Sequence, residues 1–121
     1  MIETEGLTHI HLLVRDLDRS LRFYESVFGF QEKFREGERM AFLGTSGGDT
    51  ITLNEVGPDS PDAGKSGGVD HFGFRLRDGA DRDRAITEVE AAGGALLRRG
   101  EHAPGVPFAY VADPDGYQIE L

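Results

Sequence analysis

Two histidines, His9 and His71, stand at matching places in two segments that both read as strands. His9 precedes Asp16 by seven positions, and His71 precedes Asp78 by the same seven. Imidazole nitrogens are common ligands of divalent metals, so two histidines at equivalent points of similar segments are candidate ligands of one ion. Each histidine taken alone also has a simpler interpretation, as a polar residue hydrogen-bonded to a neighbour.

Glu120 is the candidate third ligand. It lies between Ile119 and Leu121, and a carboxylate between two aliphatic residues of a strand is costly unless a cation compensates it. The alternative is a solvated glutamate on an edge strand, which would cost little. Two imidazoles and one carboxylate leave adjacent coordination positions open for a bidentate oxygen ligand. We therefore predict a metal site formed by His9, His71 and Glu120.

The elements around His9 follow from spacing. Residues 7–14 predict a strand with an apolar face, and Asp16 is a suitable N-cap for a helix that runs to about Phe28. Gly29 is placed to end this helix. The predicted buried stripe of the helix is Leu17, Leu21, Tyr24 and Phe28. Three short strands should follow, at about 30–35, 39–43 and 50–53.

The second half repeats this order. Residues 67–76 read as a buried strand with an apolar face of Phe72, Phe74 and Leu76 and an opposite face of His71, Gly73 and Arg75. A helix at 81–92 should bury Ala85, Ile86, Val89 and Ala92, and strands are expected at 95–99, 107–111 and 117–121. Aligning the ends of the halves pairs Ile51 with Ile119 and Leu53 with Leu121, so Thr52 corresponds to Glu120. The prediction is an α+β fold of two βαβββ modules.

Composition limits the class of protein. The 121 residues suit one domain, organised as module 1 (1–56), a linker (57–68) and module 2 (69–121). The chain has no cysteine, and its net charge of -9 argues against nucleic acid and anionic membranes as partners. No apolar run has the length of a signal peptide or a membrane span, so the expected location is the cytoplasm.

Five further residues are candidates for the site. His11 and Thr52 share the predicted face of His9, and Arg75 shares that of His71, so all three are candidate substrate contacts. His102, in a loop, and Tyr110, which shares a strand face with Phe108, are candidate catalytic groups. Each also has an ordinary interpretation as an exposed polar residue, a rim ion pair or an aromatic packing residue.

The segments 9–30, 70–76 and 110–121 resemble the vicinal oxygen chelate superfamily, which includes glyoxalases, bleomycin-resistance proteins, fosfomycin-resistance transferases and extradiol dioxygenases. The resemblance implies sheets curled around one metal cavity, ligand roles for His9, His71 and Glu120, and a homodimer. It implies a small-molecule substrate chelated through vicinal oxygens.

Departures from the family patterns bear on the reaction. Thr52 stands where glyoxalase I has a second glutamate, and the chain ends at Leu121, before the last basic residues of fosfomycin transferases. The order His102, Tyr110, Asp113-Pro114, Glu120 is close to the extradiol pattern. That resemblance implies Fe²⁺, with His102 moving a proton and Tyr110 donating a hydrogen bond to the oxygen reactant. The alternatives are a lyase, isomerase or thiol transferase using Mn²⁺, Ni²⁺ or Zn²⁺, and a metal-free protein that sequesters a drug.

Overall fold

The computed structural model describes residues 1–77 and 80–121, which form two compact units, Met1–Ala63 and Gly64–Leu121. Asp78, which entered the spacing argument, lies outside the described residues. We describe each unit by itself. The organisation into modules 1–56 and 69–121 with a linker stays a prediction.

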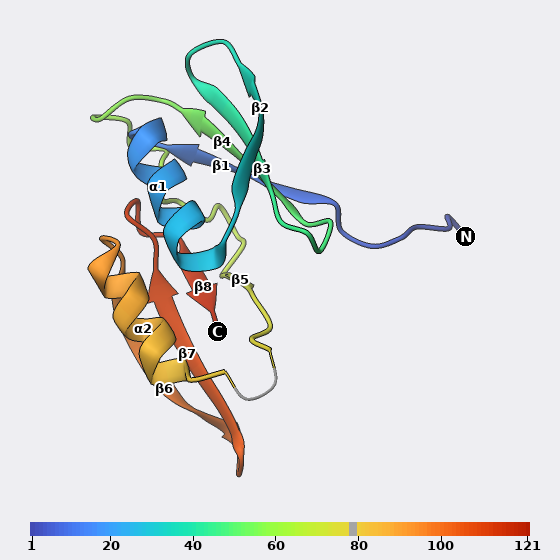
Figure 1. Ribbon diagram of the computed structural model, residues 1–121, viewed down its shortest axis with the longest axis vertical. Coiled ribbons are helices and arrows are strands. Elements are labelled where there is room, and N and C mark those ends of the chain that lie inside the picture. Colours follow the sequence, from blue (N-terminus) through green and yellow to red (C-terminus); the bar gives the residue numbers. More distant parts are fainter. Residues whose placement is uncertain (78–79) are drawn as a thin grey trace. The chain divides into compact units, whose positions relative to one another are not determined.

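The first unit is a four-stranded sheet carrying one helix (Figure 1). Its elements are β1 (His9–Val14), α1 (Leu17–Phe28), β2 (Gln31–Glu36), β3 (Met40–Gly44) and β4 (Thr50–Glu55), with strand order β1-β4-β3-β2. The Asp16 side chain accepts a hydrogen bond from the Arg19 N–H and so caps α1, which ends at Gly29 in the left-handed conformation, as predicted. Helix α1 packs on β3 and β4.

The second unit has the same order of elements. These are β5 (Phe72–Gly73), α2 (Arg82–Ala91), β6 (Ala95–Ala103), β7 (Val106–Ala112) and β8 (Gln118–Glu120), with strand order β5-β8-β7-β6. Figure 1 shows α2 lying along the long β6–β7 hairpin, and the two strands are its contacts in the sheet. The predicted repeat of strand, helix and three strands is therefore confirmed, and the fold is α+β.

The repeat extends to strand register. The first strand of each unit pairs in parallel with the last, and the remaining pairs are antiparallel. Each unit also has a β-bulge at the same place in its outer hairpin, between Glu32 and Phe34 in β2 and between Leu96 and Arg98 in β6. A bulge turns the strand that follows it, so it decides which face the next side chains occupy.

Some local predictions were wrong. The strand expected at 67–76 is only the two residues of β5, and His71 lies just before it rather than inside a buried strand. Glycines 67 and 68 have positive φ values of 57° and 108°, which extended strands do not use. In α1, Phe23 is buried where the predicted stripe had Phe28, and in α2 only Ile86 and Val89 of the four predicted residues are buried.

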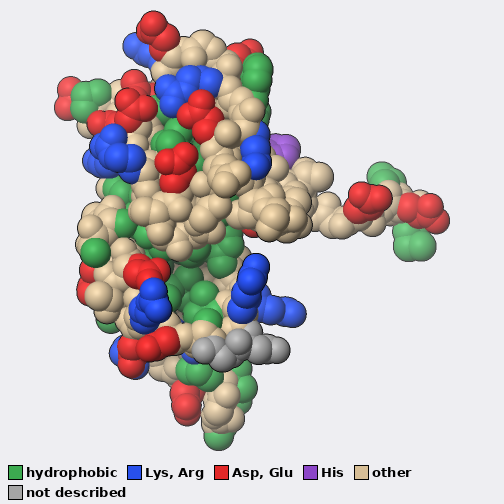
Figure 2. All heavy atoms as spheres, viewed as in Figure 1, with side chains coloured by type: hydrophobic (Ala, Val, Ile, Leu, Met, Phe, Trp, Pro, Cys, Tyr) green, Lys and Arg blue, Asp and Glu red, His purple; other side chains and the backbone are tan. Residues whose placement is uncertain are grey.

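The apolar cores lie between each helix and its sheet. Leu12, Ile51 and Leu53 are buried in the first unit, and Val89, Val111 and Ile119 are buried in the second. Acidic and basic side chains are interspersed over the visible surface (Figure 2). Within residues 1–77 and 80–121, no helix is both long enough and apolar enough to cross a membrane.

Candidate functional site

The position of Glu120 follows from a turn and a close strand contact. One carboxylate oxygen of Asp113 accepts hydrogen bonds from the N–H groups of residues 115, 116 and 117, which fixes the turn into β8. Glu120 then lies opposite Gly73 of β5. A Cβ at position 73 would come within 3.2 Å of the Glu120 carbonyl oxygen, so glycine permits this close approach.

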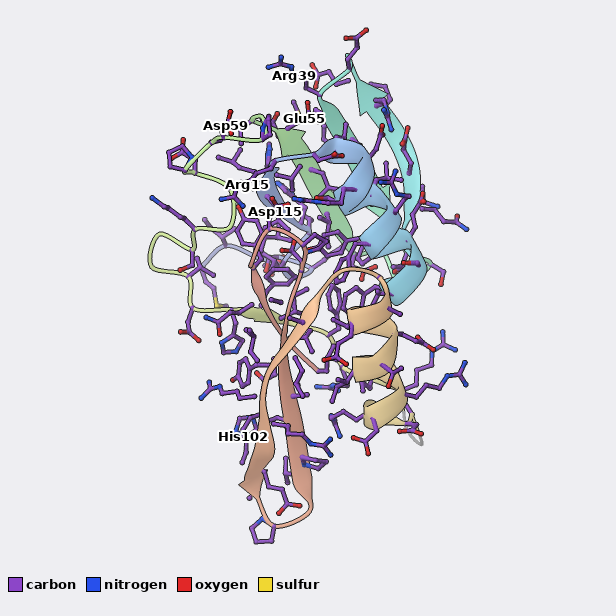
Figure 3. All side chains as sticks on the ribbon, turned by 90° about the vertical axis from the view of Figure 1, so that its left-hand side faces the viewer. Arg15, Arg39, Glu55, Asp59, His102 and Asp115 are labelled. Carbon is purple, nitrogen blue, oxygen red and sulfur yellow. The ribbon has the colours of Figure 1, made fainter. Side chains whose placement is uncertain are left out.

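The carboxylate of Glu120 holds an imidazole on each oxygen. His71 Nε2 lies 3.0 Å from Oε2, and His102 Nε2 lies 2.6 Å from Oε1. His102, predicted to lie in a loop, lies in β6, because this strand continues to Ala103 rather than ending at 99; Figure 3 labels it on the β6–β7 hairpin. The hydrogen bond from His102, followed by that from His71, lowers the pKa of Glu120 below its ordinary value, although partial burial opposes the shift. Glu120 is therefore an anion near neutral pH, as a metal ligand must be.

His71 is oriented from its other nitrogen. Its Nδ1 lies 2.7 Å from a carboxylate oxygen of Asp70, which accepts the imidazole hydrogen bond. Asp70 first, and Glu120 after it, raise the pKa of His71 above its ordinary value. A carboxylate on one imidazole nitrogen fixes the ring, an arrangement typical of metal-ligating histidines, and here it directs the other nitrogen toward Glu120.

His9 is held in the corresponding way. The hydroxyl oxygen of Thr8, the preceding residue, lies 3.0 Å from His9 Nδ1. In both units, therefore, a side-chain oxygen of the residue before the histidine engages Nδ1, and Nε2 is the ring nitrogen that this contact leaves for another partner. Thr8 contributes a hydroxyl oxygen to this contact, whereas Asp70 contributes a carboxylate oxygen.

Aromatic rings pack beside this cluster. The Tyr110 ring makes edge-to-face contacts with the rings of His71 (centroids 4.8 Å apart) and Phe108 (5.4 Å), and His102 stacks on Phe108 at 4.4 Å. A Cβ at Gly100 would come within 3.0 Å of the Phe108 ring, so glycine lets this ring lie across β6. Burial, and then the charge of Glu120, raise the pKa of Tyr110, which keeps its phenol protonated.

Of the remaining predicted residues, His11 and Thr52 lie in the first unit and Arg75 lies in the second. In the first unit, His11 is paired in register with Thr52; His11 is exposed and Thr52 is buried. Both are on the face of the sheet opposite α1, as the alternation along β1 and β4 predicts. Arg75 is exposed and follows the short β5. The structure thus brings together His71, His102, Tyr110 and Glu120 within the second unit, and His9, His11 and Thr52 within the first.

Among residues 1–77 and 80–121, no group of three His, Cys, Asp or Glu side chains is arranged to hold a metal ion. The predicted set takes His9 from one unit and His71 with Glu120 from the other, and its convergence stays a prediction. The chemistry of the donors fits a divalent cation: two imidazoles each engaged at Nδ1, and one carboxylate kept ionised.

Two residues beside the site were not predicted from the sequence. Asp70 contacts the His71 ring, and Arg98 lies with its guanidinium carbon 4.2 Å from the centre of the Tyr110 ring. No spacing rule identifies Asp70, because it precedes the strand. Arg98 reaches this face only because of the bulge in β6.

Comparisons with known proteins agree with the fold. The model of the Glyoxalase/Bleomycin resistance protein/Dioxygenase superfamily matches residues 6–121. A lactoylglutathione lyase of Haemophilus influenzae is 34% identical over 95% of this chain and 90% of its own length. A catechol-2,3-dioxygenase of Bacillus subtilis is 33% identical over 94% of this chain, which spans only 41% of that enzyme.

Solved structures give the same result. A glyoxalase-related enzyme from Fulvimarina pelagi has a TM-score of 0.69 with 28% identity, covering 97% of this chain and 86% of its own. The fosfomycin resistance protein FosX from Mesorhizobium loti has a TM-score of 0.74 with 26% identity, covering 98% of this chain and 91% of its own.

Proposed function

Because this chain belongs to the Glyoxalase/Bleomycin resistance protein/Dioxygenase superfamily, we propose that it is a divalent-metal-dependent enzyme. Its substrate is a small molecule that binds the metal through two neighbouring oxygen atoms. His9, His71 and Glu120 are the proposed ligands, and when bound the metal acts as a Lewis acid and a template for both substrate oxygens.

One observation carries this proposal: the repeated contact at Nδ1. Thr8 engages His9 and Asp70 engages His71 through a side-chain oxygen of the preceding residue. A histidine whose only role is to cap a loop or fill a surface has no need of the same orienting contact in both halves of a repeat. An orienting oxygen on one nitrogen is the usual support for a histidine that binds metal through the other.

The neighbouring side chains have defined roles in this proposal. His102, whose Nε2 lies 2.6 Å from Glu120, accepts or returns a proton of the bound substrate as general base or acid. Tyr110 is protonated and mostly buried, so its phenol donates a hydrogen bond and its ring excludes water. His11, Thr52 and Arg75 are the proposed substrate contacts.

Ring cleavage of a catechol by dioxygen is the reaction to test first, with Fe²⁺ as the metal. Its support is the grouping of His102, Tyr110 and Glu120. Protein purified without chelator is analysed for bound metals, then loaded anaerobically with Fe²⁺ and mixed with oxygen and a panel of catechols. We expect oxygen uptake that is lost in His102→Gln while metal content is kept. No uptake with any catechol contradicts the ring-cleavage assignment.

A lyase is the second candidate, because the lactoylglutathione lyase of Haemophilus influenzae matches over nearly its whole length. The ligand set accepts Ni²⁺, Zn²⁺ and Mn²⁺ as well as Fe²⁺. Protein loaded with each metal is assayed for formation of S-lactoylglutathione from methylglyoxal and glutathione. Turnover here without oxygen uptake assigns the lyase. Metal-independent binding of a drug such as bleomycin, with no metal retained, would instead assign a sequestering protein and contradict the proposed enzyme.

A further inference from the structure

Arg98 lies in a row of side chains that crosses the sheet of the second unit to Glu120. Arg98 is paired in register with Tyr110, and Tyr110 with Glu120. Residues paired in register on neighbouring antiparallel strands point to the same face of a sheet. Arg98 therefore shares the sheet face of Glu120, one of the proposed ligands, and the mechanism proposed above makes no use of it.

The bulge in β6 causes this placement. Leu96 pairs with Val111, whereas Arg98 pairs with the very next residue along β7, Tyr110. Without the extra residue, position 98 would share the helix-facing side with Leu96. The next residue, Arg99, does face the helix, where its guanidinium forms a 2.8 Å ion pair with Asp83 of α2. Two adjacent arginines thus point to opposite faces of the strand.

Arg98 is held by rings rather than by an acid. Its guanidinium carbon lies 4.2 Å from the Tyr110 ring centre and 6.0 Å from that of Phe108. Within residues 1–77 and 80–121 no carboxylate pairs with it. The N–H groups of a guanidinium lie in the plane of the group. When that plane stacks on a ring, two N–H groups at its edge can donate hydrogen bonds to two oxygens of one anion. The Tyr110 ring that carries this cation also touches the His71 imidazole.

We infer that Arg98 is a specificity-determining residue that binds an anionic group, a carboxylate or a phosphonate, on the same substrate whose neighbouring oxygens bind the metal. The inference rests on the proposed function and deepens it. In a chain of net charge -9, a cation without an acidic partner beside the ligands favours substrates with an oxyanion at one end and a vicinal oxygen pair at the other.

Binding to Zn²⁺-loaded protein, followed by calorimetry, tests this without turnover. The probes are 3,4-dihydroxybenzoate with its neutral amide, 3,4-dihydroxybenzamide, and 1,2-dihydroxypropylphosphonate with propane-1,2-diol. The variants are Arg98→Gln, Arg98→Lys, which keeps charge without the planar fork, and Arg99→Gln as the matched control on the opposite face. The quantity compared is the ratio of Kd for the neutral probe to Kd for the anionic one.

We expect wild-type protein and Arg99→Gln to prefer at least one anionic probe by about tenfold, the size of a charge-assisted hydrogen-bond pair. Arg98→Gln should bring the ratio to about one, and Arg98→Lys should keep part of it. The carboxylate and phosphonate pairs show which oxyanion is recognised. Equal binding of both members of each pair by wild type, or a ratio unchanged in Arg98→Gln, overturns the inference while the proposed function stands. Binding of no probe contradicts both.

Discussion

The two units use one backbone plan but place different chemistry on it. In the first unit the row that follows the bulge runs Phe34, Phe42, Thr52 and His11. The row at the same register in the second unit runs Arg98, Tyr110, Glu120 and Gly73. The first row holds two phenylalanines, Phe34 and Phe42, whose ring centroids lie 5.6 Å apart, and two polar residues. The other holds an anion, a phenol and a cation.

The two units therefore share equivalent backbone positions, but the side chains at those positions have different chemistry. The helix-facing neighbours stay alike, since Ile51 and Ile119 are both buried beside Thr52 and Glu120. On the opposite face, the side chains at equivalent positions differ in chemistry. The second unit therefore supplies most of the proposed chemistry, and the first supplies His9. The variants below, ordered by expected effect, test this comparison position by position.

The largest effect is expected on stability. Ile51→Ala and Ile119→Ala remove the same side chain from equivalent buried positions, and each should lower the free energy of unfolding by about 3 kcal/mol. Urea unfolding followed by circular dichroism measures both. A difference well beyond about 1 kcal/mol between them would show that the helix-facing sides are not equivalent.

At the next residue of each strand, Thr52 and Glu120, substitutions in the two units should have different effects. Glu120→Gln removes the proposed anionic ligand and should weaken Zn²⁺ binding by more than about 100-fold, because a ligand matters more than the groups that orient it. Thr52→Val changes the corresponding residue of the first unit and should alter affinity by less than about twofold. Competition with a metal-sensitive dye gives both constants. Similar losses in the two variants would refute the asymmetry.

Thr8 and Asp70, which precede His9 and His71, allow the two units to be compared at the proposed histidine ligands. Asp70→Asn replaces the carboxylate on His71 Nδ1 with a neutral amide and should weaken Zn²⁺ binding about tenfold or more. Thr8→Val removes a neutral hydroxyl from His9 Nδ1 and should cost less. The same dye competition measures both effects, and wild-type affinity in Asp70→Asn would show that the contact has no role in metal binding.

The smallest expected effect is a shift in pH dependence. Asp70, and after it Glu120, raise the pKa of His71 above 6.5. A protonated imidazole cannot bind a metal, so Zn²⁺ uptake should fall as pH falls through that raised pKa. The stability of the metal-free protein has the opposite sign: the His71 contribution is full below pH 6.5 and is lost as pH rises through the raised pKa.

Asp70→Asn removes the largest cause of the shift, so both transitions should move to lower pH. Titration of the His71 ring by NMR, with His9 as the internal comparison, measures the change. An unmoved His71 titration would contradict the assignment of Asp70 as the main cause.

Much of the fold could be predicted from local pattern. Helix α1 begins after Asp16 and ends at Gly29 as predicted, because capping chemistry is local. The repeat was predictable because each unit must bury one helix against one sheet, which imposes the same apolar spacing twice. The same spacing placed Thr52 and Glu120 at equivalent positions, and the registers of β4 and β8 agree with it.

The strand around His71 could not be predicted. The alternation from 67 to 76 is that of a strand, but only Phe72 and Gly73 pair with β8. The length of a strand depends on the partner that hydrogen-bonds to it, and β8 offers only three residues.

The sequence by itself determined the two-module fold and the residue types that could bind a metal, since these depend on periodicity and side-chain chemistry. Tertiary structure alone decided which other side chains contact the candidate ligands. Asp70 orients His71, and His102 reaches Glu120 across 18 positions of sequence. Arg98, rather than Arg99, faces the site. Contacts and bulges of this kind arise when strands pair, and one unpaired residue reverses the face of the side chains that directly follow it.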